Sequence, residues 1–166
     1  MAVPADLSAD PRRGNEIQDD PHIEAFGMLI EAHNEVLHVT QRHLEATSDV
    51  PVAWLGVLIR LARSPGQRLR MSQLARDMTM STSGLTRLVD RIEAAGQVRR
   101  EACPEDRRGL HAALTDEGRT ALAGALPGHV ADLERTIGGA LEADDLAELT
   151  RLLRRLRDHV RDSHPA

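Results

Sequence analysis

The pattern of apolar positions predicts a chain built mainly from helices. From Pro21 to about Glu45, apolar residues recur at the helical period on one face, and Asp20 just before them is a suitable N-cap. A second helix over about Pro51–Arg63 is apolar on most sides, which is typical of a buried helix. Residues 122–141 and 146–160 carry further apolar stripes. We therefore expect long helices at both ends of the chain, around a compact middle part.

The middle of the chain has the pattern of two helices joined by a tight turn. A short helix is expected from Ser72, as its N-cap, to Met78, and Thr79–Ser81 would form the turn. The next helix should run from about Ser81 to Ala95, and Gly96 supplies the left-handed residue that often ends a helix. One stripe of this second helix should pack on the core: Leu85, Leu88, Val89 and Ile92.

Short strands are expected on both sides of these two helices. Arg68–Arg70 alternates and suits one small strand, while residues 97–100 and 109–114 read as a hairpin joined across residues 101–108. Thr115 is placed to cap a following helix. A helix-turn-helix followed by a basic hairpin, or wing, is the arrangement of winged helix-turn-helix modules, which commonly read duplex DNA. We therefore expect a mainly α fold with a small β-wing.

The same pattern predicts how the chain is organised. Residues 1–20 are rich in Pro, Asp, Arg and Gly and are expected to form a flexible tail. Residues 51–115 would be the winged helix-turn-helix DNA-binding domain, and residues 21–48 and 116–164 a helical region. The apolar stripes of this region have no obvious partner within a winged module of about 60 residues. We therefore expect the long N- and C-terminal helices to be dimerisation helices in a homodimer.

Charge is distributed unevenly along the chain. The net charge is -5, but residues 60–110 hold 11 Arg and 6 acidic residues, a net charge of +5. A local basic face is sufficient for binding phosphates, because screening limits charge interactions to roughly 8 Å in physiological salt. The N-terminus lacks an apolar signal core, and no apolar run approaches the ~20 residues of a membrane span. We expect a cytoplasmic, nucleoid-associated protein with no membrane contact.

The candidate DNA contacts lie opposite the apolar stripe of the second helix and in the wing. Small hydroxyl side chains permit close approach to the major groove, and Arg87 can reach a guanine edge or a phosphate. Arginine suits a narrow minor groove, and Asp106 is expected to pair with an Arg and shape the wing. The predicted DNA-binding residues are Ser81, Thr82, Ser83, Thr86, Arg87, Arg91, Arg107 and Arg108. An ordinary solvated helix face remains the alternative for this pattern.

Two short motifs in this region match a known family. The wing carries Asp106-Arg107-Arg108 and is followed by Leu114-Thr115, and residues 84–96 read GLTRLVDRIEAAG. On these motifs, residues from about Arg60 to Gly118 resemble the MarR family of bacterial transcription regulators. The resemblance implies a homodimer whose two winged domains bind a pseudopalindromic operator in double-stranded DNA. It also implies a regulator, most often a repressor, whose DNA binding a small-molecule effector, a metal or an oxidant can loosen.

The resemblance also places an effector pocket, between the dimerisation helices and the winged domain. By position, its candidate residues are Met28, His33, Leu37, Trp54 and Leu58. Trp54 and Leu58 are equally suited to the hydrophobic core. The low aromatic content, 1% of the chain, argues against a large stacking pocket.

A metal-responsive or redox-responsive regulator of the same fold is an alternative. Glu31, Glu35 and His38 share one helical face, but the spacing of the histidines does not stack ligands for zinc, so we expect no resident metal or cofactor. Cys103 is the only cysteine, and nearby arginines would favour its thiolate; we nevertheless expect a structural wing residue. The further candidate metal ligands would be His43, His111 and His129.

The sequence argues against an enzyme. Gly138-Gly139 is not followed by the Gly-Lys-Ser/Thr ending of a phosphate-binding loop. The chain also lacks the Gly-x-Ser-x-Gly motif of a nucleophile elbow. A helical protein–protein adaptor is the remaining alternative, since the long amphipathic ends would suit one. An adaptor would keep its function when Arg87 and Arg108 become Ala, whereas a DNA-binding protein would lose it.

Overall fold

The structure, a computed structural model, describes residues 19–103 and 106–163, with the backbone alone for residues 106–108. In chain order its elements are α2 (Pro21–Thr47), α3 (Val52–Ala62), a 3-10 turn (Pro65–Gln67), β1 (Arg68–Arg70), α4 (Met71–Asp77), α5 (Thr82–Ala94), β2 (Val98–Cys103), β3 (Asp106–Leu114), α6 (Asp116–Leu133), a π-helical turn (Glu134–Gly138) and α7 (Ala143–Ser163). Helices dominate, and the strands form one antiparallel sheet. The predicted mainly α fold with a small β-wing is confirmed.

Contacts divide the chain into two parts, residues 1–39 and residues 40–166, and each is considered by itself. The first part is represented by the N-terminal turns of α2; of the predicted tail, residues 1–18 lie outside the described residues. Asp20 caps α2 as predicted, because the backbone N–H of His22 donates to Asp20 Oδ1 at 2.7 Å. This hydrogen bond lowers the pKa of the Asp20 carboxyl group.

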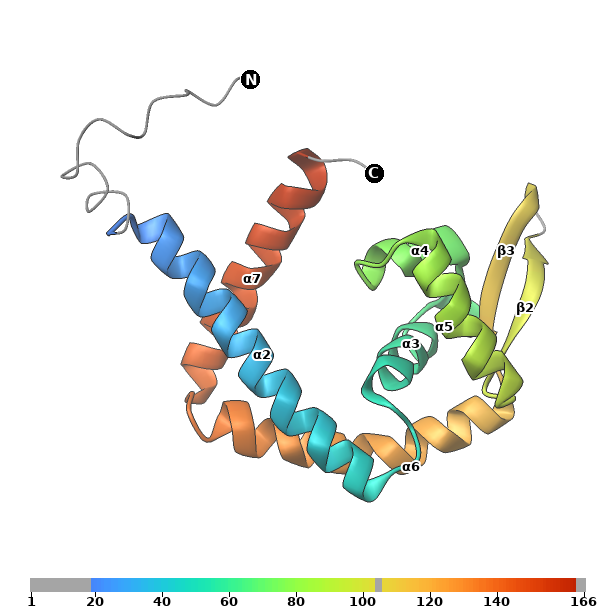
Figure 1. The fold of residues 1–166 in the computed structure, drawn as a ribbon, viewed down its shortest axis with the longest axis horizontal. Coiled ribbons are helices and arrows are strands. Elements are labelled where there is room, and N and C mark those ends of the chain that lie inside the picture. Colours follow the sequence, from blue (N-terminus) through green and yellow to red (C-terminus); the bar gives the residue numbers. More distant parts are fainter. Residues whose placement is uncertain (1–18, 104–105, 164–166) are drawn as a thin grey trace. The chain divides into compact units, whose positions relative to one another are not determined.

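The hydrophobic core of the second part lies between α3, α4, α5 and the sheet. In Figure 1, these three helices gather on one side of the hairpin formed by β2 and β3. The predicted apolar stripes are buried: Leu55, Val57, Leu58 and Leu61 on α3, and Leu85, Leu88, Val89 and Ile92 on α5. Burying one such side chain contributes about 1.5–3 kcal/mol, so this contact fixes which side of α5 remains exposed.

The three strands are ordered β1-β3-β2. Val98, Ala112 and Leu114 lie on one face of the sheet and are buried in the core. The hairpin strands extend further towards the wing tip than predicted, because pairing continues as far as Cys103 opposite Asp106. Backbone hydrogen bonds can propagate through charged residues whose side chains stay in water, so the apolar pattern alone underestimated the strand lengths.

One predicted helix start is wrong. The sequence suggested Ser72 as an N-cap, but α4 begins at Met71, and Arg70 stands at the N-cap without capping the helix through its side chain. The reason is that β1 leads directly into α4. Arg70 is paired with His111 in the sheet, so the helix starts at the next residue.

The start of α6 is held against the base of the wing. Thr115 caps α6 as predicted, by accepting a hydrogen bond from the Gly118 N–H at 3.0 Å, and its own hydroxyl donates to the Gly96 carbonyl oxygen at 2.7 Å. A Cβ atom at Gly118 would lie 2.0 Å from the carbonyl oxygen of Gln97 and 2.8 Å from Leu114 Cδ1. Position 118 therefore requires glycine because the backbone of Gln97, just before β2, approaches α6 closely.

Gly118→Ala is expected to lower the free energy of unfolding by about 1–3 kcal/mol, because the added methyl group overpacks this contact. Gly124→Ala is the matched control on the same helix, since a Cβ there meets nothing within 4 Å. It should leave stability unchanged or raise it by up to about 1 kcal/mol through helix propensity. Urea denaturation of both variants measures the difference, and equal midpoints would contradict the close approach.

Candidate nucleic-acid interface

The N-terminus of α5 is fixed by its own side chains. Thr79 forms the preceding turn with a φ of +53°, a conformation that is uncommon for a β-branched residue. Ser81 is the N-cap, and its Oγ accepts a hydrogen bond from the Gly84 N–H at 3.1 Å. Gly96 ends the helical segment with a φ of +73°, as predicted. The turn and both ends of α5 are therefore set by local interactions.

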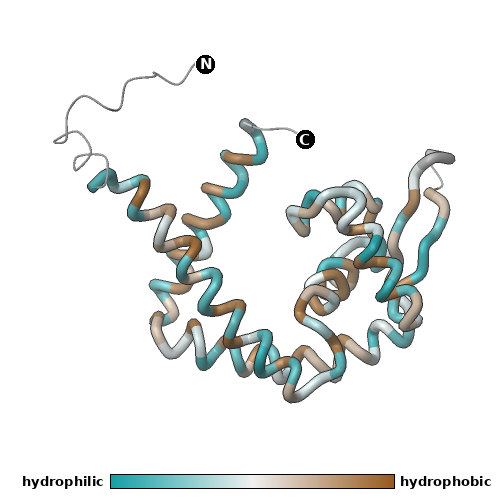
Figure 2. The backbone as a smooth tube through the Cα atoms, viewed as in Figure 1, coloured by the Kyte–Doolittle hydropathy of each residue, from teal (hydrophilic) through white to brown (hydrophobic). Residues whose placement is uncertain are grey.

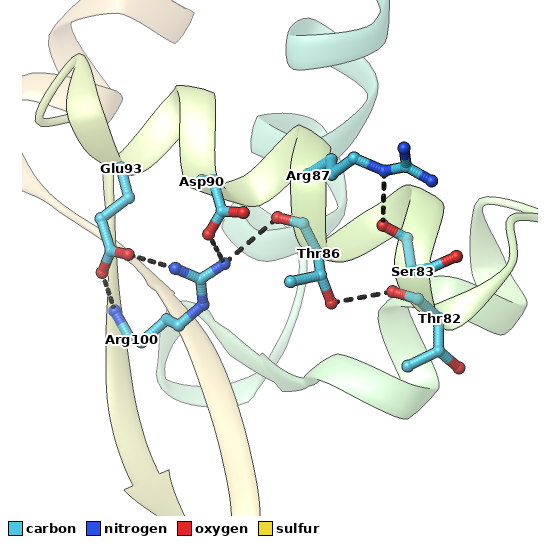
Figure 3. A network of polar contacts seen from close by, with 7 residues as sticks. All are labelled: Thr82, Ser83, Thr86, Arg87, Asp90, Glu93 and Arg100. Carbon is cyan, nitrogen blue, oxygen red and sulfur yellow. Dashed lines mark hydrogen bonds and ion pairs between the residues drawn. The ribbon is translucent and has the colours of Figure 1, made fainter.

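The predicted contact residues of α5 share an exposed surface. Thr82, Ser83, Thr86, Arg87 and Arg91 are all exposed, while the opposite stripe is buried. The Thr86 hydroxyl donates to the Thr82 carbonyl oxygen at 2.8 Å, and Arg87 Nε donates to the Ser83 carbonyl oxygen at 3.4 Å (Figure 3). The structure thus presents three hydroxyl side chains and two guanidinium groups on the outside of one helix.

A cluster of charged groups joins this helix to the wing. Arg100 on β2 binds Glu93 through Nη1, and its Nη2 donates to Asp90 Oδ1 at 2.7 Å and to the Thr86 carbonyl oxygen at 3.2 Å. The backbone N–H of Arg100 also donates to Glu93 Oε1 at 2.7 Å. Figure 3 shows Asp90, Glu93 and Thr86 directed towards the guanidinium of Arg100 from one side of α5.

Sequence reasoning missed this cluster. Residues 86, 90 and 93 follow the i, i+4, i+7 spacing of one helix face, and a strand places Arg99 and Arg100 on opposite faces. Those two signals could have indicated the pairing. Arg99 instead lies on the outer face of the sheet, where its Nη2 is 2.6 Å from Glu101 Oε1 and Arg68 Nη1 is 3.7 Å from Glu101 Oε2.

The wing tip is described only in part. Asp106 pairs with Cys103 through the backbone, whereas the side chains of Asp106, Arg107 and Arg108 lie outside the described residues, so their roles stay predictions. The Cys103 side chain is buried. Reactive cysteines are usually partly exposed, so this burial favours the structural interpretation of Cys103 over a redox sensor.

The predicted effector residues fall in two places. Met28, His33 and Leu37 are exposed on α2, in the first part of the chain. On α3, Leu58 is completely buried in the core and Trp54 is half-buried and packed against it. These positions favour the core interpretation of Leu58, and the effector pocket stays a prediction.

The described residues do not assemble the candidate metal ligands. Across residues 19–103 and 106–163, no three His, Cys, Asp or Glu side chains come close enough to hold a metal ion. His43 instead lies with its Nδ1 3.2 Å from Oδ1 of the buried Asp132. In the same part of the chain, no helix combines the length and apolar character needed to cross a membrane.

A winged helix-turn-helix with this exposed α5 surface is the architecture of a class of DNA-binding proteins. A family model described as the MarR family matches residues 48–109. Two MarR family transcriptional regulators from Streptomyces coelicolor are similar to the chain in structure. Sco3205, solved in complex with DNA, is 34% identical with a TM-score of 0.74 over 86% of this chain and 87% of its own. AbsC is 34% identical with a TM-score of 0.76 over 86% of this chain and 96% of its own.

The chain belongs to the MarR family, which confirms the resemblance inferred from its motifs. Members of this family are transcription regulators and not enzymes. The HTH-type transcriptional regulator PecS from Dickeya dadantii is 34% identical over 89 residues, which cover 54% of this chain and 53% of PecS. The chain thus spans about half the length of this curated relative.

Ser81→Ala is expected to lower the free energy of unfolding by about 1 kcal/mol, because the variant loses the cap of α5. Ser83→Ala is the matched control, since the Ser83 hydroxyl caps no backbone N–H and makes only a long contact of 3.3 Å, to Ser81 Oγ, among the described side chains. Thermal unfolding monitored by circular dichroism compares them. If Ser83→Ala destabilised the protein as strongly as Ser81→Ala, the capping role of Ser81 would be wrong.

Proposed function

We propose that the chain is a dimeric, sequence-specific DNA-binding transcription regulator that acts as a repressor and is relieved by a small-molecule effector. The observation that carries the proposal is the exposed surface of α5, which Ser81 and the buried stripe hold in one orientation. Residues 51–115 would bind DNA, and residues 21–48 and 116–164 would form the dimer. Two related proteins support DNA binding: Sco3205 and an Escherichia coli MarR variant, 25% identical with a TM-score of 0.69, were solved with DNA.

The α5 surface can read base edges in the major groove. Because the Thr86 hydroxyl already donates to Thr82, its lone pairs are left to accept hydrogen bonds from an adenine N6 or cytosine N4 amino group. Arg87 can bind the O6 and N7 atoms of guanine, and Arg91 can reach a phosphate. Arg107 and Arg108 would enter the flanking minor groove, where the negative potential favours arginine. Such a protein would act on the nucleoid in the cytoplasm.

The repressor and effector roles rest on the family. The HTH-type transcriptional repressor YetL from Bacillus subtilis is 29% identical over 67% of this chain. A repressor needs only to occupy its operator, so binding by two winged domains is sufficient for this role. An effector would relieve repression if it bound preferentially to a state in which the two α5 helices no longer match the operator.

The apolar face of α7 supports dimerisation. Figure 2 shows apolar residues recurring along this helix. Five of them keep 40–51% of their surface exposed, on one helical face: Leu146, Leu149, Leu153, Leu156 and Val160. Contiguous apolar surface on a helix marks an interaction site. Two copies of the chain would bury this face and place two α5 helices on half-sites about one helical turn, 34–36 Å, apart.

The first test is binding to the DNA upstream of the chain's own gene, measured by fluorescence anisotropy at two salt concentrations. Wild type should bind this DNA more tightly than random DNA of equal length. Arg87→Ala should lose about 1–3 kcal/mol on the upstream DNA and little on random DNA, because a base contact is lost. Arg154→Ala on α7 removes the same charge and should bind like wild type.

Two results would contradict parts of this proposal. An equal loss on every DNA sequence would assign Arg87 to a phosphate. The proposal of a sequence-specific regulator would be overturned if the wild type bound no bacterial promoter DNA more tightly than random DNA at either salt concentration.

Leu153→Asp is expected to weaken the dimer by about 3 kcal/mol or more, roughly 100-fold or more in Kd, because both copies lose an apolar contact and bury a charge. Ala147→Asp adds the same carboxylate to the exposed opposite face of α7 and should leave the dimer intact. Sedimentation velocity at micromolar concentrations gives the masses. A wild-type monomer, or equal effects of both substitutions, would be the contrary result.

A further inference from the structure

Arg100 occupies an unusual place between the wing and α5. It lies on β2 in register with Ala112, and its side chain keeps only 20% of its surface exposed. A surface arginine normally leaves its guanidinium in water, whereas this group contacts Asp90, Glu93 and the Thr86 carbonyl oxygen on α5. These contacts of the Arg100 guanidinium with α5, called the joint below, connect β2 to the helix. They leave little of the guanidinium surface for a phosphate.

The joint spans two turns of α5. Thr86, Asp90 and Glu93 are separated by four and three residues, so one planar guanidinium contacts successive turns along one side of the helix. Charge-assisted hydrogen bonds in a fork geometry restrict both position and rotation. Glu93 adds a further restraint, since its carboxylate also accepts from the backbone N–H of Arg100. Rotation of α5 about its axis would break several of these bonds together.

The restrained side of α5 adjoins the surface that is proposed to read DNA. Thr86 belongs to both, because its carbonyl oxygen accepts from Arg100 and its hydroxyl lies on the exposed surface. Discrimination between bases depends on placing donors and acceptors to within a fraction of an ångström, whereas attraction to phosphates tolerates larger displacements. A residue that fixes the rotation of α5 relative to the wing therefore acts on discrimination more than on total affinity.

We propose that Arg100 is a positioning residue that sets the sequence discrimination of α5 without touching DNA. The proposal rests on the proposed DNA-binding function. Arg100 holds the recognition helix and the wing in one arrangement through Asp90, Glu93 and the Thr86 backbone. Asp90 and Glu93 then serve to bind Arg100. This role accounts for two acidic residues on a helix whose neighbouring side chains would face phosphates.

The test compares Arg100→Met with Arg99→Met. Methionine keeps the length of the side chain but loses the charge and the hydrogen bonds. Arg99 is the matched control because it is the adjacent residue of β2, on the outer face of the sheet, and is bonded to Glu101 instead of α5. The measured quantity is the ratio of Kd on random DNA to Kd on upstream DNA, together with the salt dependence of each Kd.

Arg100→Met is expected to lower this ratio by about tenfold or more, chiefly by weakening binding to upstream DNA, and to leave the salt dependence on random DNA unchanged. Arg99→Met should keep the ratio. If Arg100 contacts a phosphate directly, Arg100→Met would weaken both DNAs equally and reduce the salt slope by about 1. That result would overturn the proposal.

Two further variants keep the test valid if Arg100→Met does not fold. Arg100→Lys retains the charge but not the fork, so it should also lower the ratio while preserving the fold. Asp90→Asn removes the negative charge of one anchor of Arg100 at a half-exposed site but keeps an oxygen that can accept, so it should lower the ratio less than Arg100→Met. If either variant kept the wild-type ratio of Kd on random DNA to Kd on upstream DNA, the guanidinium of Arg100 would not be what positions α5.

Hydrogen exchange on the DNA-free protein separates this proposal from the proposed function. Loss of the joint should speed exchange of the backbone amides over residues 86–93 by about tenfold in Arg100→Lys or Arg100→Met, and Arg99→Met should leave them unchanged. If the Arg100 variants exchange faster but the wild type does not discriminate between DNA sequences, the structural role of Arg100 is supported and the proposed function is overturned. Unchanged exchange would overturn the joint itself.

Discussion

Burial of one stripe of α5 is the contact on which the rest of the site depends. Leu85, Leu88, Val89 and Ile92 are all at most 2% exposed, so the helix cannot turn without exposing them to water. At about 1.5–3 kcal/mol for each side chain, their burial outweighs any polar contact on the opposite face. The exposed hydroxyl and guanidinium groups therefore face outward because the core selects the other side of the helix.

Burial of apolar side chains is non-directional and leaves small rotations and shifts of α5 to be decided by polar contacts. Ser81 fixes the N-terminal end through the Gly84 N–H, and Arg100 fixes the C-terminal half through Glu93 and Asp90. The base of the wing is fixed in turn to α6 by Thr115. Hydrogen bonds thus connect the exposed surface of α5, the described base of the wing and the start of α6.

The features that the sequence could predict are the local ones. The α5 stripe, the stop at Gly96 and the cap at Thr115 each depend on residues within a turn or two along the chain. The Arg100 contacts could not be predicted in the same way, because they depend on how β2 packs against α5. Arg99 and Arg100 are adjacent residues of the same type, so the sequence does not show which of them faces the helix. The Ser72 cap failed for a related reason, since the pairing of Arg70 in the sheet determined where α4 begins.

The exposed stripe on α7 links this body to the proposed DNA geometry. Five large apolar side chains that remain exposed to water forgo several kcal/mol of stabilisation relative to full burial. A single chain leaves them exposed. A symmetric pair of chains would bury the stripe, and the distance between its two α5 helices would then follow from α6, which connects the wing to α7. In the proposed dimer, half-site spacing would therefore depend on the helices that connect the wing to the apolar stripe, and base discrimination on the contacts between β2 and α5.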